Sequence, residues 1–221
     1  MSQSSNPAWR VTSPEEFATL LARGYEVRGV EFKGPGPRAD ANLLAKVTRA
    51  VLGMSNLRDG GRVVIGIAET NAVLTARGLT AADLVSWQYD LVATAIAEYA
   101  DPYVRFDLEQ VVYKAATCIV LHVYEFDELP ILCRRDLTVK VNGKDKTVLR
   151  KSAMYVRSRH KPETAEVRTQ EEMREVLNLA IDKGVRRFVE RAHSVGLTGQ
   201  LFVPPPASDA LLFDQQGSDL L

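Results

Sequence analysis

The segment from Arg62 to Ala68 places the strongest constraint on how this chain can fold. It is a short apolar run bounded by glycines, reading Gly60-Gly61-Arg62-Val63-Val64-Ile65-Gly66-Ile67-Ala68-Glu69 with its flanks. Runs of this length and composition are typical of a strand that is buried on both faces at the centre of a sheet. We therefore expect the rest of the chain to be built around a central strand at 62–68.

Helix signals lie on both sides of this strand. Ser13-Pro14-Glu15-Glu16 is a capping box with proline at the first helical position, and Gly24 ends the predicted helix. Thr169-Gln170-Glu171-Glu172 is a second capping box, which predicts a helix to about residue 193. Two further helices are expected, one capped by Asp40 and running to about Met54, and one in one or two pieces over 81–99.

Strand signals gather in the middle of the chain. Residues 25–33 look extended, and the segments 104–113, 117–126 and 153–157 look like strands. Asn142-Gly143 predicts a tight hairpin. Helices first and clustered strands later indicate an α+β domain with a mixed or mostly antiparallel sheet flanked by helices. We expect this domain at 13–195, a flexible segment at 1–12 and a proline-rich, acidic tail at 196–221.

The chain carries no signal for a membrane or for export. No apolar run approaches the roughly 18 residues of a membrane span. The first residues, Met-Ser-Gln-Ser-Ser-Asn-Pro, lack the basic and apolar regions of a signal peptide. Cys118 and Cys133 are expected to be reduced core thiols, and we expect a cytoplasmic protein.

The charge is evenly balanced overall but unevenly distributed. The net charge is zero, whereas residues 134–161 hold ten Lys and Arg against two Asp, a net charge of +8. Such a stretch is either a solvated hairpin with lysine-guarded edges or a face that contacts phosphate groups. The candidate nucleic-acid contacts within it are Lys140, Lys144, Lys146, Arg150, Lys151, Arg157, Arg159 and Lys161.

Common nucleotide and hydrolase motifs are missing from the sequence. There is no Gly-x4-Gly-Lys-Ser/Thr, and the glycine-rich turn at 34–37 contains two prolines, which offer no N–H groups to a phosphate. There is also no Gly-x-Ser-x-Gly. ATPase and serine hydrolase activities therefore lack a sequence basis.

Four charged residues near the apolar strands could form a catalytic group: Glu26, Glu31, Lys33 and Glu69. Three carboxylates together can hold Mg²⁺ or Mn²⁺, which activates water at a scissile phosphate, and a lysine can stabilise the charge that develops. A regular strand would place Glu26 and Glu31 on opposite faces, so they converge only if the chain bends near Gly29. The alternative is that all are exposed residues beside strands.

These residues carry a family resemblance. Glu26-x4-Glu31-Phe32-Lys33, then Asn56-x3-Gly60-Gly61-x-Val63-Val64-Ile65-Gly66-Ile67-x-Glu69, then Tyr155-Val156-Arg157-Ser158-x5-Thr164-Ala165 resemble the Schlafen AlbA-type domain over residues 14–180. The resemblance implies an α+β fold. It also implies that Glu26, Glu31 and Glu69 occupy the positions of the three acidic residues with which some members cut tRNA and rRNA. Glu69 stands where the family often has Asp.

The resemblance leads to one preferred function and two alternatives. The preferred one is a metal-dependent endoribonuclease acting on tRNA or another structured RNA, with RNA favoured over DNA. Family analogy implies a role in stress or anti-phage defence. The animal enzymes have two lobes and a Cys/His zinc site, whereas this chain has one lobe and lacks that zinc site. We therefore expect a homodimer, in which the helix at 169–193 or the tail takes part. The alternatives are a non-catalytic DNA- or RNA-binding module and, less favoured, a nucleotide-binding protein.

Overall fold

The computed structural model describes residues 13–71, 73–159, 161 and 163–196. The predicted segments 1–12 and, apart from Gly196, 196–221 lie outside these residues. The chain divides into two compact units, Met1–Ala180 and Ile181–Leu221. Within the described residues, no helix is both long and apolar enough to cross a membrane.

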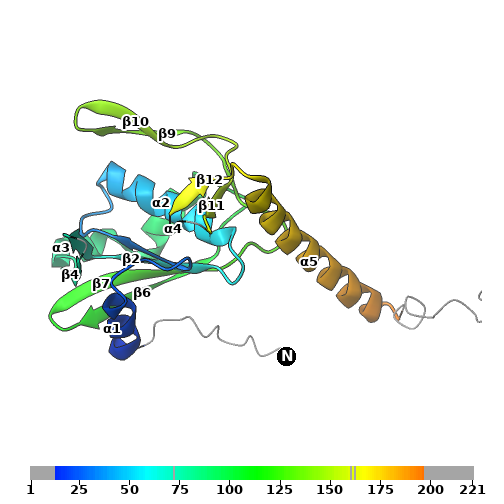
Figure 1. Cartoon of the computed structure of the whole chain (residues 1–221), viewed down its shortest axis with the longest axis horizontal. Coiled ribbons are helices and arrows are strands. Elements are labelled where there is room, and N and C mark those ends of the chain that lie inside the picture. Colours follow the sequence, from blue (N-terminus) through cyan, green and yellow to red (C-terminus); the bar gives the residue numbers. More distant parts are fainter. Residues whose placement is uncertain (1–12, 72, 160, 162, 197–221) are drawn as a thin grey trace, which may run out of the picture. The chain divides into compact units, whose positions relative to one another are not determined.

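The first unit is built on a four-stranded mixed sheet (Figure 1). Its strand order is β1-β2-β7-β6, formed by Val30–Lys33, Gly61–Ile65, Ala116–Val123 and Phe106–Tyr113. Strands β1 and β2 are parallel, and the other two pairs are antiparallel. The prediction of an α+β fold with a mixed sheet and a central strand near 62–68 is confirmed.

Helices cover both faces of this sheet. Helix α2 (Ala41–Ser55) buries residues such as Val47 and Val51 in one core with Val63, Ile65 and Leu121 of the sheet. Helix α1 (Pro14–Ala22) buries Phe17 and Leu20 in a second core, together with Val30, Phe32 and Val64. The alternation of Val63, Val64 and Ile65 between the two cores follows from the period-2 geometry of a strand.

Both predicted N-terminal caps of these helices are present. Asp40 accepts hydrogen bonds from the backbone N–H groups of Asn42 and Leu43 at 2.9 and 3.1 Å. Ser13 and Glu16 form the reciprocal capping box. These contacts fix where α1 and α2 begin, because they satisfy N–H groups that have no partner inside the helix.

The remaining elements lie outside the four-stranded sheet in the chain's hydrogen-bond pattern. They are helices α3 (Ala81–Ser86), α4 (Tyr89–Ala97) and α5 (Gln170–Ser194), and the two-stranded pairs β3 (Ile67–Thr70) with β4 (Val73–Ala76), β5 (Ala100–Asp101) with β8 (Leu132–Cys133), β9 (Leu137–Val141) with β10 (Lys144–Leu149), and β11 (Tyr155–Arg157) with β12 (Thr164–Glu166). The Asn142-Gly143 hairpin is confirmed as the turn between β9 and β10, with φ values of 51° and 75°.

Two strand predictions were wrong in their extent. The expected strand at 62–68 ends at Ile65, because Gly66 takes a φ of 110° and the chain leaves the sheet to form the β3–β4 hairpin. The expected extended segment at 25–33 contains a strand only from Val30, since the chain turns just before it and the Val30 N–H bonds to the carbonyl of Val27 at 2.9 Å. Because of these differences, Glu69 lies on the β3–β4 hairpin and Glu26 lies before β1.

Candidate functional site

Glu31 lies on β1 and is almost fully buried, with 8% of its surface exposed. Its Oε2 accepts hydrogen bonds from Arg157 Nη1 and from Thr164 Oγ1, each at 2.7 Å. Its Oε1 accepts a hydrogen bond from Lys33 Nζ. Both carboxylate oxygens are therefore occupied by groups of the protein itself.

Arg157 is the centre of this network. The residue is 1% exposed, and its guanidinium donates from Nε to the carbonyl of Arg28 at 2.9 Å and from Nη2 to the carbonyl of Val30 at 3.1 Å. Arg28 returns a bond from its own Nε to the carbonyl of Arg157 at 3.1 Å. The planar guanidinium thus joins β11 to the turn and strand at 27–31. Arg157, predicted to contact phosphate, is placed inside the protein.

Glu26 approaches the same guanidinium from the turn before β1. Its Oε1 accepts the Phe32 N–H at 2.7 Å, and its Oε2 lies 3.5 Å from Arg157 Nη2. The turn that carries Arg28 and Gly29 therefore brings Glu26 and Glu31 to one cation, as a bend near Gly29 would require. The pKa of Glu26 is raised, chiefly because burial disfavours the charged form, and the neighbouring Glu31 adds to this effect. The Phe32 N–H and the charges of Lys33 and Arg157 oppose it.

The raised pKa of Glu26 predicts a pH dependence of stability. A carboxyl group that holds its proton more tightly in the folded state loses stability as pH rises from its unfolded pKa, near 4.5, through its folded pKa. Glu26→Gln removes this titration while keeping an acceptor for the Phe32 N–H. We expect the variant to lose less free energy of unfolding than the wild type between about pH 4.5 and 7 in urea titrations. Glu15→Gln, on the exposed face of α1, is the control, and an equal decline in all three proteins would contradict the prediction.

Glu69 lies apart from this network. It is exposed on β3, within the β3–β4 hairpin rather than at the end of the central strand. Glu26, Lys33 and Glu69 nevertheless line one pocket of about 910 Å³, at the carboxyl end of β1 and the start of α2. Lys46 and Asn42 of α2, which the sequence analysis did not single out, line it as well. The side-chain oxygen of Asn42 is buried and has no hydrogen-bond partner among the described residues.

The described residues do not form a three-carboxylate metal site. Nowhere in 13–71, 73–159, 161 and 163–196 do three His, Cys, Asp or Glu side chains gather closely enough to hold one ion. Mg²⁺ and Mn²⁺ bind free carboxylate oxygens, and those of Glu31 are held by Arg157, Thr164 and Lys33. Glu26 and Glu69 are the two expected ligands that line the open pocket.

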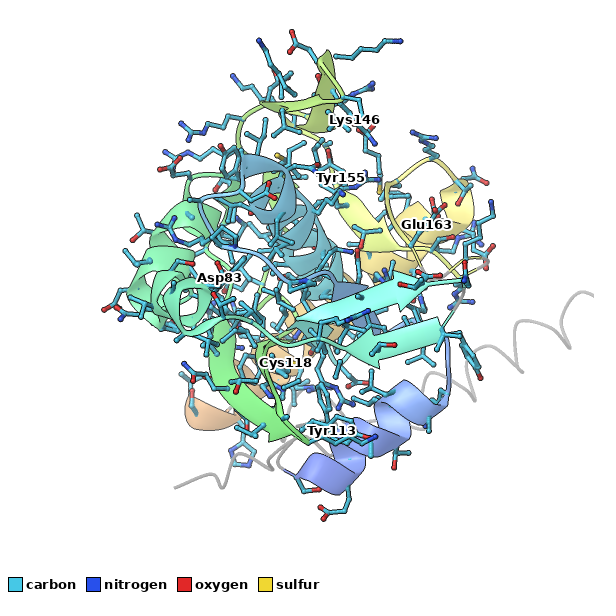
Figure 2. All side chains as sticks on the ribbon, turned by 90° about the vertical axis from the view of Figure 1, so that its left-hand side faces the viewer. Asp83, Tyr113, Cys118, Lys146, Tyr155 and Glu163 are labelled. Atoms are coloured by element: carbon cyan, nitrogen blue, oxygen red, sulfur yellow. The ribbon has the colours of Figure 1, made fainter. Side chains whose placement is uncertain are left out.

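The β9–β10 hairpin extends over α2 (Figure 1) and carries three of the predicted basic contacts, Lys140, Lys144 and Lys146. Val139 and Val148 of the hairpin pack on Ala45 of α2. Paired residues of an antiparallel hairpin share a face, so Lys144 and Lys146, opposite Val141 and Val139, lie on the side turned to α2. Lys140, opposite Asp145, lies on the outer side. All three lysines are exposed, and Figure 2 shows Lys146 at the outside of the molecule.

Apart from Arg157, the other predicted basic contacts are exposed, and their partners differ. Arg150 lies 3.6 Å from Glu166, and Arg159 donates to Glu175 at 3.1 Å and to Glu171 at 3.4 Å. Lys151 and Lys161 are exposed as well. Of the eight predicted contacts, Arg157 alone is buried.

Comparisons with known proteins show only distant likeness. Neither a protein-family model nor a curated protein sequence matches this chain. Among solved structures, the N-terminal domain of a putative ATP-dependent DNA helicase RecG-related protein from Nitrosomonas europaea is 24% identical, with a TM-score of 0.43, over 63% of this chain and 88% of that one. The DIP2311 protein from Corynebacterium diphtheriae is 18% identical, with a TM-score of 0.39, over 59% of this chain. This chain spans only 25% of that protein's length. The resemblance to Schlafen AlbA-type domains rests on the motifs quoted above.

Proposed function

We propose that this chain is a nucleic-acid-binding module that contacts the phosphate backbone through the β9–β10 hairpin. The observation that carries the proposal is the exposure of Lys140, Lys144 and Lys146 on a hairpin whose base continues into exposed Arg150 and Lys151. Lysines on both faces of a two-stranded ribbon can reach phosphates on either side of it. RNA is the favoured ligand, and DNA is the alternative.

The salt dependence of binding tests this proposal. Each lysine that neutralises a phosphate of a single strand contributes about 0.7 to the slope of log affinity against log salt. The variant Lys140→Gln/Lys144→Gln/Lys146→Gln should therefore lower that slope by about 2. If only the electrostatic part of binding changes, the affinity falls about 100-fold at 0.1 M salt. Fluorescence anisotropy with labelled RNA and DNA strands measures both quantities and the preference between them.

A matched variant controls for the loss of charge. Arg23→Gln/Arg77→Gln/Lys114→Gln removes three exposed cations from another part of the surface. It should bind as the wild type does. Equal weakening by both variants would mean that the hairpin has no special role, and failure of the wild type to bind either nucleic acid would end the proposal.

Metal-dependent RNA cleavage is the second candidate, because Glu26, Lys33 and Glu69 line one pocket. Glu69→Gln is the suitable variant, since Glu69 is exposed and its substitution leaves the buried network intact. Glu31 is unsuitable, because its loss would remove the carboxylate that Arg157 bonds at 2.7 Å inside the protein. Cleavage of tRNA with Mn²⁺ by the wild type, absent with EDTA and absent in Glu69→Gln, would favour the nuclease. If the wild type does not cleave tRNA, the nuclease is ruled out and the binding module remains the proposed function.

The expected homodimer is also a proposal, and helix α5 offers a surface for it. Exposed apolar side chains recur along the helix at spacings of three and four residues: Met173, Leu177, Ile181, Val185 and Phe188, each 38–59% exposed. Acids predominate from Glu171 to Asp182, and bases predominate from Lys183 to Arg191. Two antiparallel copies would therefore place opposite charges together. A monomer at micromolar concentration in sedimentation would argue against the dimer.

A further inference from the structure

A second pocket, of about 630 Å³, lies on another part of the first unit. It is lined by the turn before β1, the turn before β2, and residues near the start of α5. Its charged lining residues are Arg28, Arg58, Arg62 and Arg159 against Asp59 and Glu175, a formal net charge of +2. Of the four arginines, only Arg159 was a candidate from the sequence. The first and the last of them are 131 positions apart in the chain.

Glu175 holds two of these arginines side by side. Its Oε2 accepts Arg28 Nη2 at 2.6 Å and Arg159 Nε at 3.1 Å. Burial alone would raise the pKa of Glu175, but the two guanidinium groups outweigh it and lower that pKa, so the carboxylate is charged at neutral pH. Arg28 is fixed further by its bond to the carbonyl of Arg157. Two guanidinium groups are thus positioned at the pocket before any ligand arrives, which reduces the cost of ordering them.

Arg62 is the least satisfied of the four. Its Nε is buried and has no hydrogen-bond partner among the described residues. Burial also lowers the pKa of Arg62; the charge of Glu16 opposes this effect and the charge of Arg23 adds to it. A buried donor without an acceptor costs about 1–3 kcal/mol. Because Arg62 lines the pocket, an anion bound there would compensate its positive charge.

We propose that this pocket binds a phosphate monoester. The dianion matches the +2 charge of the lining, and arginine forks suit phosphate oxygens. The volume falls within the range of small-molecule sites and exceeds what a bare phosphate needs. The monoester can come from a mononucleotide or from the 5′ end of a nucleic-acid strand. The site does not depend on the hairpin and stands whether or not the hairpin binds nucleic acid.

Calorimetric titration tests the proposal with three probes: inorganic phosphate, 5′-AMP, and an oligonucleotide with or without a 5′-phosphate. The wild type should bind 5′-AMP, and Arg62→Gln should weaken that binding at least about tenfold, the loss of one charge-assisted hydrogen bond. Arg77→Gln, an exposed arginine outside this pocket, should bind as the wild type does. Arg159→Gln, more than half of whose side chain is exposed, gives a second test if Arg62→Gln does not fold.

The three probes separate the sources of the phosphate. Tighter binding of the 5′-phosphorylated strand than of its 5′-hydroxyl form, lost in Arg62→Gln, identifies a strand end. Equal binding of the two strands together with binding of 5′-AMP identifies a mononucleotide. The hairpin triple variant should retain 5′-AMP binding, which separates this site from the hairpin. Failure of the wild type to bind any phosphorylated probe at millimolar concentration, or unchanged binding in both arginine variants, would overturn the proposal.

Discussion

Replacing Arg157 by methionine is expected to lower the free energy of unfolding by about 3 to 5 kcal/mol. The substitution removes the guanidinium that donates to Glu31 Oε2 at 2.7 Å and leaves this buried carboxylate with Lys33 and Thr164 alone. It also removes the two guanidinium N–H groups that donate to the carbonyls of Arg28 and Val30. Urea unfolding at pH 7 measures the loss directly.

Two further variants separate the ion pair from the size of the side chain. Arg159→Met removes an arginine whose side chain is 52% exposed and should cost less than about 1 kcal/mol. Arg157→Met/Glu31→Met removes both buried charges. Because an apolar pair avoids the cost of desolvation, the double variant should be more stable than Arg157→Met alone. If Arg157→Met cost no more than Arg159→Met, the network would not hold this part of the fold.

The same network changes how the acidic motif is interpreted. Glu26, Glu31, Arg157 and Thr164 were all quoted as parts of one resemblance, and the structure brings them into contact. The contacts are internal, so a shared motif can reflect a shared structural connection between β1, β11 and β12 as well as shared chemistry. Loss of activity in a Glu31 variant would therefore not show by itself that Glu31 binds a metal.

The features predicted correctly from sequence are those fixed by local chemistry. The capping box at Ser13, the cap at Asp40 and the Asn142-Gly143 turn each depend on side chains within a few residues of the backbone that they fix. The central strand was found because burial on both faces leaves a continuous apolar run. Local patterns of this kind need no knowledge of the rest of the fold.

The features that were missed depend on distant partners. Arg157 looked like one more cation of the basic stretch, and its partner Glu31 lies 126 positions away. Glu69 was expected beside Glu31, but the φ of Gly66 ends β2 and directs the chain into the β3–β4 hairpin. A glycine in an apolar run permits either outcome, and the close approach of Leu79 and Cys118 to Gly66 involves residues that are distant in the sequence. The arginine pocket likewise gathers residues from three separate segments.

Gly60→Ala is expected to destabilise the protein by about 3 kcal/mol or more. Gly60 has a φ of 70°, and a Cβ atom there would lie 2.1 Å from the carbonyl oxygen of Val123 on β7. The neighbouring backbone cannot move aside easily, because Gly61 and Val123 are paired within the central sheet. The expected cost therefore has two parts, the strain of a positive φ and the overlap with β7.

Gly143→Ala isolates the first of these parts. Gly143 has a φ of 75°, nearly the same as that of Gly60, but no atom lies within 4 Å of its added Cβ. This variant should cost only about 1 kcal/mol, the conformational penalty of an alanine at positive φ. The difference between the two variants in urea unfolding then measures how closely the turn before β2 approaches β7. Equal costs would mean that the turn can shift. In that case Arg58 and Asp59, which line the arginine pocket beside Gly60, would not be held in place by the sheet.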